Sequence, residues 1–393
     1  MDIVLVETSN VSPHLETGLE LALRHVNTGD RVYYFFVGHS VSYSEFVVNS
    51  WKRKLLAGLP EYNGSKLISS SRFIFKEPSR AEVMRTHQLP VFSYIEDLKQ
   101  FQYHNYRVGL AALSSLVSLA QDPEPNLLDN KEILEAIINS GISIYNYCMK
   151  IFSQVNPDLV YLFNGRFANN RAIMDAAIES RVSYQIHERG ANKNKYFLKP
   201  FAPHNLPKLI EDMFELWKAR SNNANHIAEE YFSNRRRGAD LEWVSFTKNQ
   251  VKGKLPLVGK EAKRLVAYYS SSEDEFVAAG DYYKWTMWPS QFAAASDLID
   301  VVARNQDLFL VIRLHPHLAF KSSRELEHWK SIRLPTNCAL IMPDEKIDSY
   351  ALIDCSDVVV TSGSTVGIEA VFWGKPSICL GPSLYSHLDA VYL

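Results

Sequence analysis

The segment that most constrains the fold is the stretch 357–376, DVVVTSGSTVGIEAVFWGKP, near the C-terminus. Its valines predict a buried strand, and the residues before Gly374 predict a helix. The polar turn between them consists of Thr361, Ser362, Gly363, Ser364 and Thr365. A helix that starts after such a turn presents backbone N–H groups at its positive end, which suits a phosphate. Glu369, inside the helix, would reach a sugar hydroxyl of a nucleotide bound there. The alternative is an ordinary α/β unit with a serine cap.

A second strand also ends in polar residues. The apolar run Leu308–Ile312 predicts a buried strand, followed by Arg313 and His315. In open α/β sheets, ligands bind outside the carboxyl ends of the strands. Arg offers a fixed fork of donors and His a tunable one, so both suit a phosphate or carboxylate. The alternative is that Arg313 pairs with a surface acid and His315 caps a loop. Two such strand ends in one small domain favour a binding function.

The sequence RLHPH at 313–317, followed by VVTSGSTVGIEAVFWGKPSICLG at 359–381, resembles the donor-binding half of GT-B glycosyltransferases. The likeness is greatest to bacterial capsule and lipopolysaccharide enzymes that use CMP-activated Kdo or sialic acid, and it covers about the last third of the chain. It implies two Rossmann-like domains that face each other across a cleft. It also implies that Glu369 contacts the ribose of the donor. The sequence departs from the family patterns in two ways. Thr361 and Ser362 stand where the paired-glutamate motif of many retaining members has its first acid. The acidic motif of many bacterial sialyltransferases is also missing, and this absence favours Kdo over sialic acid as the donor sugar.

Size and composition fit a globular enzyme of two domains. The chain has 393 residues, 46% of them hydrophobic and 22% charged, and this length suits two α/β domains. The formal net charge of −2 gives no indication of nucleic-acid binding. The four cysteines have no metal-ligand spacing, which favours a reducing cytoplasm. No apolar run approaches the roughly 20 residues of a membrane-spanning helix.

The order of predicted elements divides the chain. A strand at Ile3–Val6, a helix capped by Ser12 and a further strand open a doubly wound sheet. A long helix is predicted over Lys131–Val155, and a strand over Leu159–Phe163. The βα pattern restarts at Leu265. We therefore expect an N-terminal, acceptor-side domain over 1–245 and a C-terminal, donor-side domain over 262–393, with the junction near 240–262.

The predicted N-terminal domain carries its own polar strand ends. Asn164 and Arg166 follow one strand, and Glu188 and Arg189 end the next. Glu188 is a candidate base or charge-stabilising carboxylate, and a structural Arg–Glu pair is an equal alternative. Asn164, Arg166 and Arg189 are candidate substrate contacts. His14 lies in the first βα turn, where several inverting GT-B enzymes carry their base, and its alternative is a helix-start histidine.

Three further features complete the candidate site. Ser271 follows the first strand of the second domain and could meet the donor phosphate. The acids 273–275 after it are expected to be a solvated helix start. No DxD pair stands at a strand end, so no catalytic metal is predicted. The run Arg235–Arg237 would allow peripheral contact with anionic lipids at the inner membrane, but three arginines favour a solvated linker.

Three functions remain open from the sequence. The first is a cytoplasmic, metal-independent glycosyltransferase with no cofactor, a nucleotide-sugar donor as co-substrate and a glycan or glycolipid acceptor. The second is a nucleotide-sugar 2-epimerase or a polyol-phosphate transferase on the same fold; an epimerase would need more acids around the sugar than Glu369. The third is a non-catalytic sugar-nucleotide-binding module. The chain stops soon after its last predicted strand, so we expect either one module of a longer protein or a short family variant.

Overall fold

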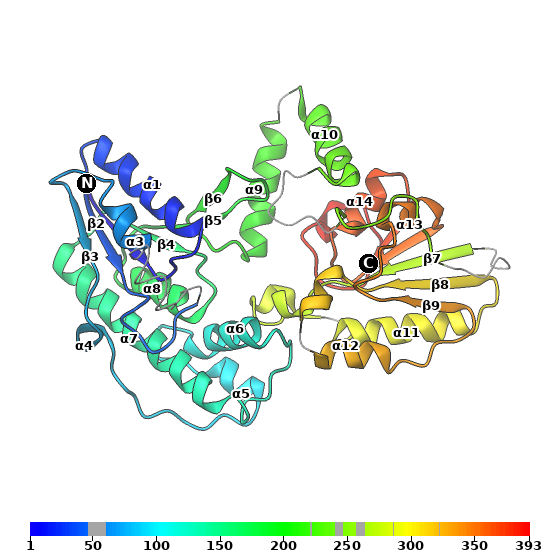
Figure 1. The fold of residues 1–393 in the computed structure, drawn as a ribbon, viewed down its shortest axis with the longest axis horizontal. Helices are drawn as coiled ribbons and strands as arrows, with labels where there is room; N and C mark the ends of the chain where they lie inside the picture. The colour runs from blue at the N-terminus through cyan, green and yellow to red at the C-terminus, as the bar shows by residue number, and fades with distance from the viewer. Residues whose placement is uncertain (46–59, 221, 240–246, 257–263, 286, 322) are drawn as a thin grey trace. The chain divides into compact units, whose positions relative to one another are not determined.

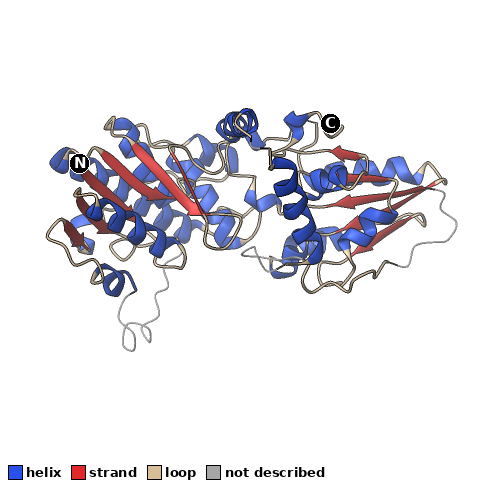
Figure 2. Ribbon diagram, turned by 90° about the horizontal axis from the view of Figure 1, so that it is seen from above, coloured by secondary structure: helices blue, strands red, loops and turns tan. Residues whose placement is uncertain are grey.

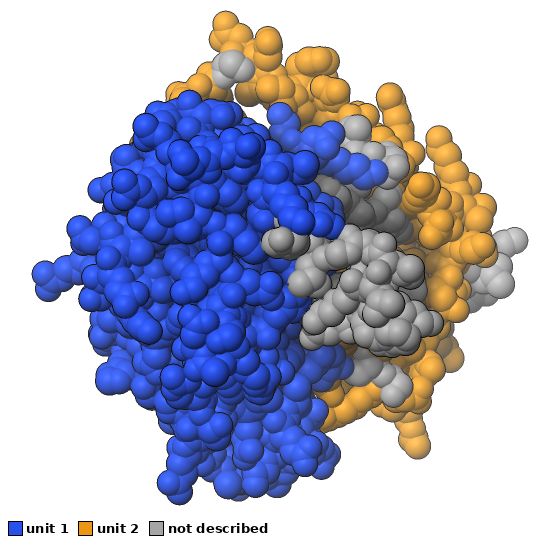
Figure 3. All heavy atoms as spheres, turned by 60° about the vertical axis from the view of Figure 1, so that its left-hand side comes forward, with its two compact units in different colours: residues 1–120, 124–205 blue, residues 121–123, 206–393 orange. Residues whose placement is uncertain are grey.

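The computed structural model describes residues 1–45, 60–220, 222–239, 247–256, 264–285, 287–321 and 323–393. Within these ranges the chain forms two compact units (Figure 1). Unit 1 comprises residues 1–120 and 124–205, and unit 2 comprises residues 121–123 and 206–393 (Figure 3). Each unit is built on a sheet of its own, so the two are described separately.

Unit 1 contains a six-stranded sheet with the strand order β3-β2-β1-β4-β5-β6. The strands are β1 (Asp2–Glu7), β2 (Arg31–Phe36), β3 (Phe73–Lys76), β4 (Leu159–Phe163), β5 (Tyr184–Arg189) and β6 (Tyr196–Lys199). The first five run parallel, and β6 is antiparallel to β5. This is the strand order of a Rossmann-type sheet. The expected strand at 159–163 is confirmed, whereas β3 and β6 were not predicted.

The helices of unit 1 follow the pattern expected for a doubly wound sheet (Figure 2). They are α1 (His14–Asn27), α3 (Pro60–Ser65), α4 (Arg80–Val83), α5 (Ile95–Gln100), α6 (Val108–Ala120), α7 (Lys131–Val155) and α8 (Ala168–Glu179). The long helix predicted at 131–155 is confirmed. It was predictable because its apolar residues recur at helical spacing. The cap predicted at Ser12 is wrong. The residue before α1 is Pro13, and no side chain caps the helix.

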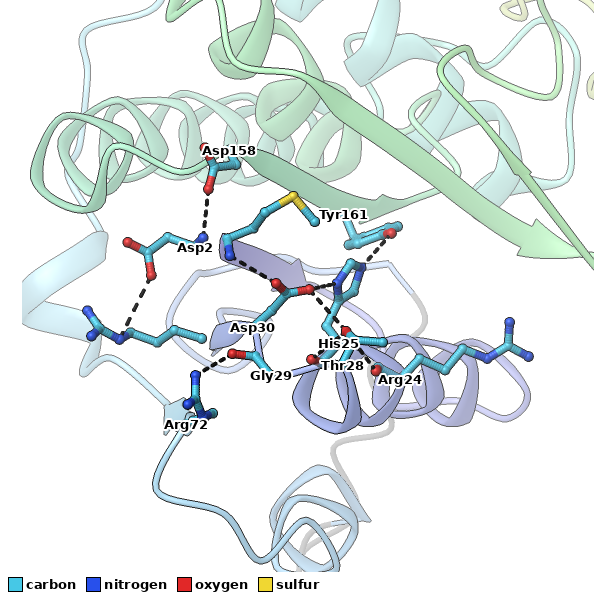
Figure 4. Close-up of polar contacts among 11 residues, drawn as sticks. Asp2, Arg24, His25, Thr28, Gly29, Asp30, Arg72, Asp158 and Tyr161 are labelled. Carbon is cyan, nitrogen blue, oxygen red and sulfur yellow. Dashed lines mark hydrogen bonds and ion pairs between the residues drawn. The ribbon is translucent and has the colours of Figure 1, made fainter.

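A network of polar contacts lies at the amino edge of the unit 1 sheet, where its parallel strands begin (Figure 4). His25 at the end of α1 bonds Asp30 through Nδ1 at 2.7 Å and the Tyr161 hydroxyl through Nε2 at 2.9 Å. Asp30 also accepts from the Thr28 hydroxyl at 3.2 Å. Asp158, just before β4, accepts from the first residue of β1 at 2.8 Å. These contacts tie the end of α1 to the turn before β2 and to β4, and they tie the start of β1 to the residue before β4.

Unit 2 contains a five-stranded parallel sheet with the order β11-β10-β7-β8-β9. The strands are β7 (Arg264–Tyr269), β8 (Leu308–Arg313), β9 (Cys338–Ile341), β10 (Val358–Thr361) and β11 (Ser377–Cys379). Residues that alternate along β7 face two separate apolar clusters: Tyr268 packs with Trp329 on one side, and Tyr269 packs with Leu352 on the other. A sheet that is apolar on both faces is what a parallel α/β arrangement requires.

The helices and 3₁₀ turns of unit 2 connect these strands. They are α9 (Leu206–Lys218), α10 (Ala224–Arg237), η1 (Glu273–Glu275), η2 (Asp281–Tyr283), α11 (Gln291–Ala303), η3 (Pro316–Phe320), α12 (Ser323–Lys330), α13 (Ser349–Cys355), α14 (Val366–Phe372) and η4 (Ser386–Leu388). Both sheets have Rossmann-like strand order. The expectation of two Rossmann-like α/β units, as a GT-B-like fold requires, is therefore confirmed.

The compact units divide at 205 and 206, earlier than the junction expected at 240–262. Of that junction, residues 240–246 and 257–263 lie outside the described residues. The helices α9 and α10 group with unit 2. The run Arg235–Arg237 is the last turn of α10, and its first two arginines make ion pairs with Glu369 and Asp354. The prediction of a solvated linker at this run is wrong, because these side chains contact the body of unit 2.

Candidate functional site

The strand order of unit 2 places a topological switch point between β7 and β10. From β7 the chain continues through β8 and β9 on one side, and β10 and β11 lie on the other. Ligands of open α/β sheets bind outside the carboxyl ends of the strands at such a point. The loops after the two strands are joined there, because the Ser271 hydroxyl donates to the Ser362 carbonyl at 2.7 Å.

A pocket lies at the carboxyl ends of β7 and β8, beside the start of α14. It encloses about 570 Å³ of empty space, which includes open solvent at its mouth. Its lining is formed by Arg235, Thr247, Gln250, Tyr269, Ser270, Arg313, Leu314, His315, Pro316, Ser349, Tyr350, Ile353, Ser364, Thr365, Val366 and Glu369. Five of the eight residues expected to bind the donor are among them.

The turn after β10 has two sides. Ser364 and Thr365 line the pocket. Ser362 instead points into the unit and shares a hydrogen bond of 2.5 Å with the Tyr268 hydroxyl. Gly363 has φ of +86°, and a Cβ there would collide with the Pro382 carbonyl oxygen. A glycine is therefore required for this turn. Ser362 and Gly363 shape the turn, whereas Ser364 and Thr365 face the space that a ligand would occupy.

Glu369 is held by three hydrogen bonds beside the pocket and is only 3% exposed. Its Oε1 accepts from Arg235 Nε at 3.2 Å and from the Thr365 hydroxyl at 3.3 Å. Its Oε2 accepts from the Tyr350 hydroxyl. Burial, reinforced by the neighbouring Glu369 carboxylate, raises the pKa of Tyr350 well above its usual value, so this hydroxyl stays protonated and remains a donor. The carboxylate is thus fixed in one orientation before any ligand arrives.

Arg313 ends β8 and is 2% exposed. Its two terminal nitrogens donate to the carbonyls of Met342 at 2.6 Å and Glu345 at 3.0 Å. Within the described residues its Nε has no hydrogen-bond partner. Burial lowers the pKa of Arg313, but an arginine remains charged. The side chain both holds the loop after β9 and places a cation at the pocket wall. In the described residues its terminal nitrogens contact backbone carbonyls and not a surface acid, so the alternative of a surface ion pair is wrong.

His315 follows β8 and is fixed by two backbone contacts. Its amide donates to the Ser270 hydroxyl oxygen at 2.8 Å, and its Nδ1 accepts from the His317 amide at 3.2 Å. Burial, with the nearby His317, lowers the pKa of His315 to about 4, so the ring is neutral near pH 7. Because Nδ1 accepts, the proton lies on Nε2. The ring can therefore donate one hydrogen bond without carrying a charge.

The loop after β7 also carries a buried acidic cluster that the sequence did not reveal. Asp274 pairs with Lys321, and each side chain is only 5% exposed. Burial, aided by Asp274, raises the pKa of Glu325 to about 7. Gln291 links Glu325 at 3.3 Å to the backbone of Ser271 at 3.1 Å. The expectation that 273–275 form a solvated helix start is therefore wrong for Asp274. Glu325 was missed because it lies in a charged, surface-like helical segment.

In unit 1 the two candidate catalytic residues lie side by side. His14 Nδ1 is 3.6 Å from Glu188 Oε1. Glu188 Oε2 accepts from Asn164 Nδ2 at 2.7 Å, and Glu188 Oε1 accepts from the Arg189 amide at 2.9 Å. Asn164 adopts φ of +56°, an uncommon backbone conformation outside glycine. Glu188 thus accepts hydrogen bonds from Asn164 and the Arg189 amide and lies near His14. Within the described ranges no arginine side chain forms the ion pair that the structural alternative required.

The environment of this pair shifts the pKa values of Glu188 and His14 in opposite directions. Burial raises the pKa of Glu188, although the hydrogen bond from Asn164 opposes the shift. Burial lowers the pKa of His14 to about 3, and His187 and Arg189 add to the effect. Near pH 7 the imidazole is therefore neutral and weakly basic, whereas the carboxylate has gained basicity. Of the two, Glu188 is the better proton acceptor.

Behind this pair lies a second acid and histidine. Glu7 Oε1 and His187 Nε2 are 2.6 Å apart, and both side chains are fully buried. In the described part of the chain, Glu7 Oε2 and His187 Nδ1 have no hydrogen-bond partner. Glu7 was missed by the sequence analysis, although an acid that ends an apolar strand was a usable signal. Of the expected substrate contacts, Arg166 lies over the Phe167 ring at 4.5 Å, and Arg189 is exposed.

The described residues contain no cluster of three or more His, Cys, Asp or Glu side chains arranged to hold a metal ion. Within the same residues, no helix combines the length and apolar character needed to cross a membrane.

No protein-family model matches the chain, and no curated protein does. Among solved structures, a beta Kdo 2,4 transferase, KpsC from Thermosulfurimonas dismutans, has 15% identity over 60% of this chain and 72% of that one, with a TM-score of 0.43. The UDP-GlcNAc 2-epimerase of Neisseria meningitidis bound to UDP-GlcNAc has 12% identity over 100% and 87%, with a TM-score of 0.29. S. aureus MnaA with UDP has 13% identity over 97% and 79%, with a TM-score of 0.26. All three TM-scores are below 0.5, so the fold assignment rests on the strand orders given above.

Proposed function

We propose that this chain is a glycosyltransferase that takes a sugar from a nucleotide-activated donor and transfers it without a catalytic metal. The observation that carries the proposal is the pocket at the carboxyl ends of the unit 2 strands, beside the switch point. It gathers Arg313 and His315 from one strand end, Ser364 and Thr365 from another, and Glu369 from α14. These are a cation, hydrogen-bond donors and one oriented carboxylate, which suit a nucleoside with phosphate groups.

The proposed chemistry follows from the charges that develop during glycosyl transfer. The bond from the anomeric carbon to the donor phosphate breaks, and negative charge builds on the leaving phosphate. Ser364 and the His315 Nε2–H are the proposed side-chain donors to that phosphate, and the buried Arg313 cation stabilises the negative charge that develops there. Thr365, whose hydroxyl donates to Glu369, is proposed to hold that carboxylate beside the donor. Glu369 is the proposed contact to the ribose. Ser362, Gly363 and Ser271 are assigned to holding the turn, because their contacts lie within the unit.

Unit 1 is the proposed source of the base for the acceptor. Glu188 would take the proton of the acceptor hydroxyl as that oxygen attacks the anomeric carbon. His14, 3.6 Å away, would act as a neutral hydrogen-bonding neighbour. Asn164 would orient the carboxylate, and Arg166 and Arg189 would contact the acceptor. The glycan or glycolipid acceptor, the sugar Kdo, the cytoplasmic location and contact with the inner membrane are proposed on the sequence resemblance alone.

One observation favours a second candidate, a nucleotide-sugar 2-epimerase. Such an enzyme needs acids beside the sugar, and the sequence offered mainly Glu369. The cluster of Asp274 and Glu325 beside the loop after β7 supplies one buried and one half-buried carboxyl group. A carboxyl group whose pKa is near 7 can accept and donate protons near neutral pH.

The test has two stages. The first is thermal stabilisation by CMP and by nucleoside diphosphates, since a ligand at 100 times its Kd stabilises a protein by about 2.7 kcal/mol. No stabilisation by any nucleotide would contradict the proposal. The second stage incubates the chain with the corresponding nucleotide sugars. Release of free nucleotide with sugar transfer or hydrolysis supports a transferase, whereas an epimeric nucleotide sugar identifies an epimerase. Binding with neither reaction would leave a non-catalytic binding module.

A further inference from the structure

Arg235 enters the donor pocket from a helix that the sequence had placed in a linker. It is the twelfth residue of α10, and it lines the pocket beside Glu369. Its Nε donates to Glu369 Oε1 at 3.2 Å across 134 residues of sequence. Its side chain is 24% exposed, whereas that of Glu369 is 4% exposed. The buried carboxylate therefore has its counter-ion on α10, a helix that precedes the first strand of the unit 2 sheet.

The position of Arg235 is determined by how α10 packs. The Phe232 ring stacks on the Phe372 ring of α14, with centroids 4.3 Å apart and an interplanar angle of 24°. Arg236 pairs with Asp354 of α13 and lies over the Trp373 ring at 4.6 Å. These contacts fix the last turn of α10 against the two helices that flank the pocket. Arg235 is thereby held in place without depending on the ion pair alone.

The hydrogen bonds to Glu369 leave limited room for a ligand. An ionised carboxylate has about four lone-pair positions. Arg235 and Thr365 occupy two on Oε1, and Tyr350 occupies one on Oε2. One acceptor position remains on Oε2, at a residue that lines the pocket. A single hydroxyl of a ribose can use it, whereas a 2′- or 3′-deoxyribose that lacks this hydroxyl would leave it unpaired.

We propose that Arg235 is a positioning residue of the donor pocket, which fixes Glu369 so that the pocket selects ribonucleotides over deoxyribonucleotides. This inference rests on the proposed function, because it requires a nucleotide in the pocket. It assigns to α10 a part in donor specificity. If Arg235 had only a structural role, its substitution would lower the stability of the fold and would leave the preference for ribose over deoxyribose unchanged.

The experiment measures the affinity of the full chain for the nucleotides that stabilise it, each as the ribose, 2′-deoxy and 3′-deoxy form, by calorimetry. For the unmodified protein we expect tighter binding of the ribose form than of one deoxy form by about tenfold or more, the usual effect of a hydrogen bond to a charged group. In Arg235→Gln the ratio of the Kd for the deoxy form to the Kd for the ribose form should fall toward one, mainly through weaker binding of the ribose form. Tyr350→Phe should lower the ratio in the same direction.

The matched control is Arg236→Gln, the neighbouring arginine on the same helix turn, which contacts Asp354 and does not line the pocket. Because the stacking of Phe232 on Phe372 still holds this helix turn in the variant, the change should lower the melting temperature and keep the ratio. Arg235→Lys retains the positive charge and serves if Arg235→Gln does not fold. An unchanged ratio in the folded Arg235 variant, or equal binding of ribose and deoxy forms by the unmodified protein, would overturn the inference while leaving nucleotide binding intact. Absence of all nucleotide binding would contradict the proposed function itself.

Discussion

The two edges of the unit 1 sheet contain the same residue types, a histidine paired with an acid, but differ in how completely the histidine is hydrogen-bonded. At the amino edge, His25 uses both ring nitrogens, one with Asp30 and one with Tyr161 (Figure 4). At the carboxyl edge, His187 is fully buried and uses one nitrogen with Glu7, and its other nitrogen has no partner in the described residues. Nearly all buried polar groups in proteins are paired. The histidine at the amino edge therefore belongs to a complete structural network, whereas His187 lies beside the residues of the proposed site with one nitrogen unpaired in the described residues.

The two edges also differ in the pKa of one carboxyl group each. Burial raises the pKa of Glu188. The hydrogen bond from His25 lowers the pKa of Asp30, at the opposite edge, to about 2. A carboxylate with a lowered pKa is stabilised in its charged form and contributes to folding. A carboxylate with a raised pKa is a better base. The following experiments would break or sharpen this division, and they are taken in order of expected effect.

The largest effect is expected for Glu188→Gln. Turnover should fall by two or more orders of magnitude, the usual scale for loss of a positioned general base, while donor affinity stays nearly unchanged. In the unmodified protein, kcat/KM should fall as the pH drops through the raised pKa of Glu188, because the base must be deprotonated. This acid limb should disappear in the variant. Rates over a pH series and melting temperatures, measured on one preparation, test it.

The matched control for this change is Glu16→Gln, an exposed acid in the first turn of α1. It should alter neither the rate nor the acid limb. A folded, fully active Glu188→Gln protein would remove Glu188 from the site and leave His14 as the next residue to test. A lower melting temperature with normal turnover would place Glu188 among the structural groups.

The same division appears within one turn of unit 2, at two serines. Ser364→Ala and, separately, His315→Ala should weaken binding of the nucleotide sugar by about 1.5–3 kcal/mol, the value of a hydrogen bond to a charged group. Ser362→Ala is the control, because its hydroxyl bonds Tyr268 inside the unit. It should lower the melting temperature and spare affinity. Unchanged affinity in both Ser364→Ala and His315→Ala would show that the donor does not bind at this turn.

Local patterns in the sequence were enough to predict the helices and strands, but not to predict which residues contact the side chains of the candidate site. The long helix and the βα units were predictable because apolar spacing is a local property. The proximity of His14 to Glu188 depends on β4 pairing with both β1 and β5 in the sheet, and strand order is set by packing. The role of α10 was hidden for a similar reason. Three consecutive arginines resemble a linker until Glu369 and Asp354, more than a hundred residues away, are brought beside them.

A smaller effect is expected at the amino edge, for Asp30→Asn. The pKa of Asp30 falls from 3.8 to about 2, first through the hydrogen bond from His25. Its contribution to stability should therefore be present above about pH 4 and vanish as the pH falls toward 2. The melting temperature of the variant should lie below that of the unmodified protein at pH 7, and the difference should close over that range. Turnover at pH 7 should be unchanged in the folded variant. A loss of turnover would contradict the division between the edges.

The smallest expected effect is for Tyr161→Phe. Tyr161 lies in β4, the strand whose other end leads to Asn164, so it connects the two edges through one short element. The change removes the 2.9 Å hydrogen bond to His25 Nε2 and should cost about 1 kcal/mol of stability, the usual net value of such a bond. Because packed strands are stiff, the loss should stay at the amino edge, with kcat/KM unchanged. Denaturation and initial rates on the same sample test this. A fall in kcat/KM at full stability would show that the hydroxyl influences Asn164 and Glu188 along the strand, and the two edges would then form one network.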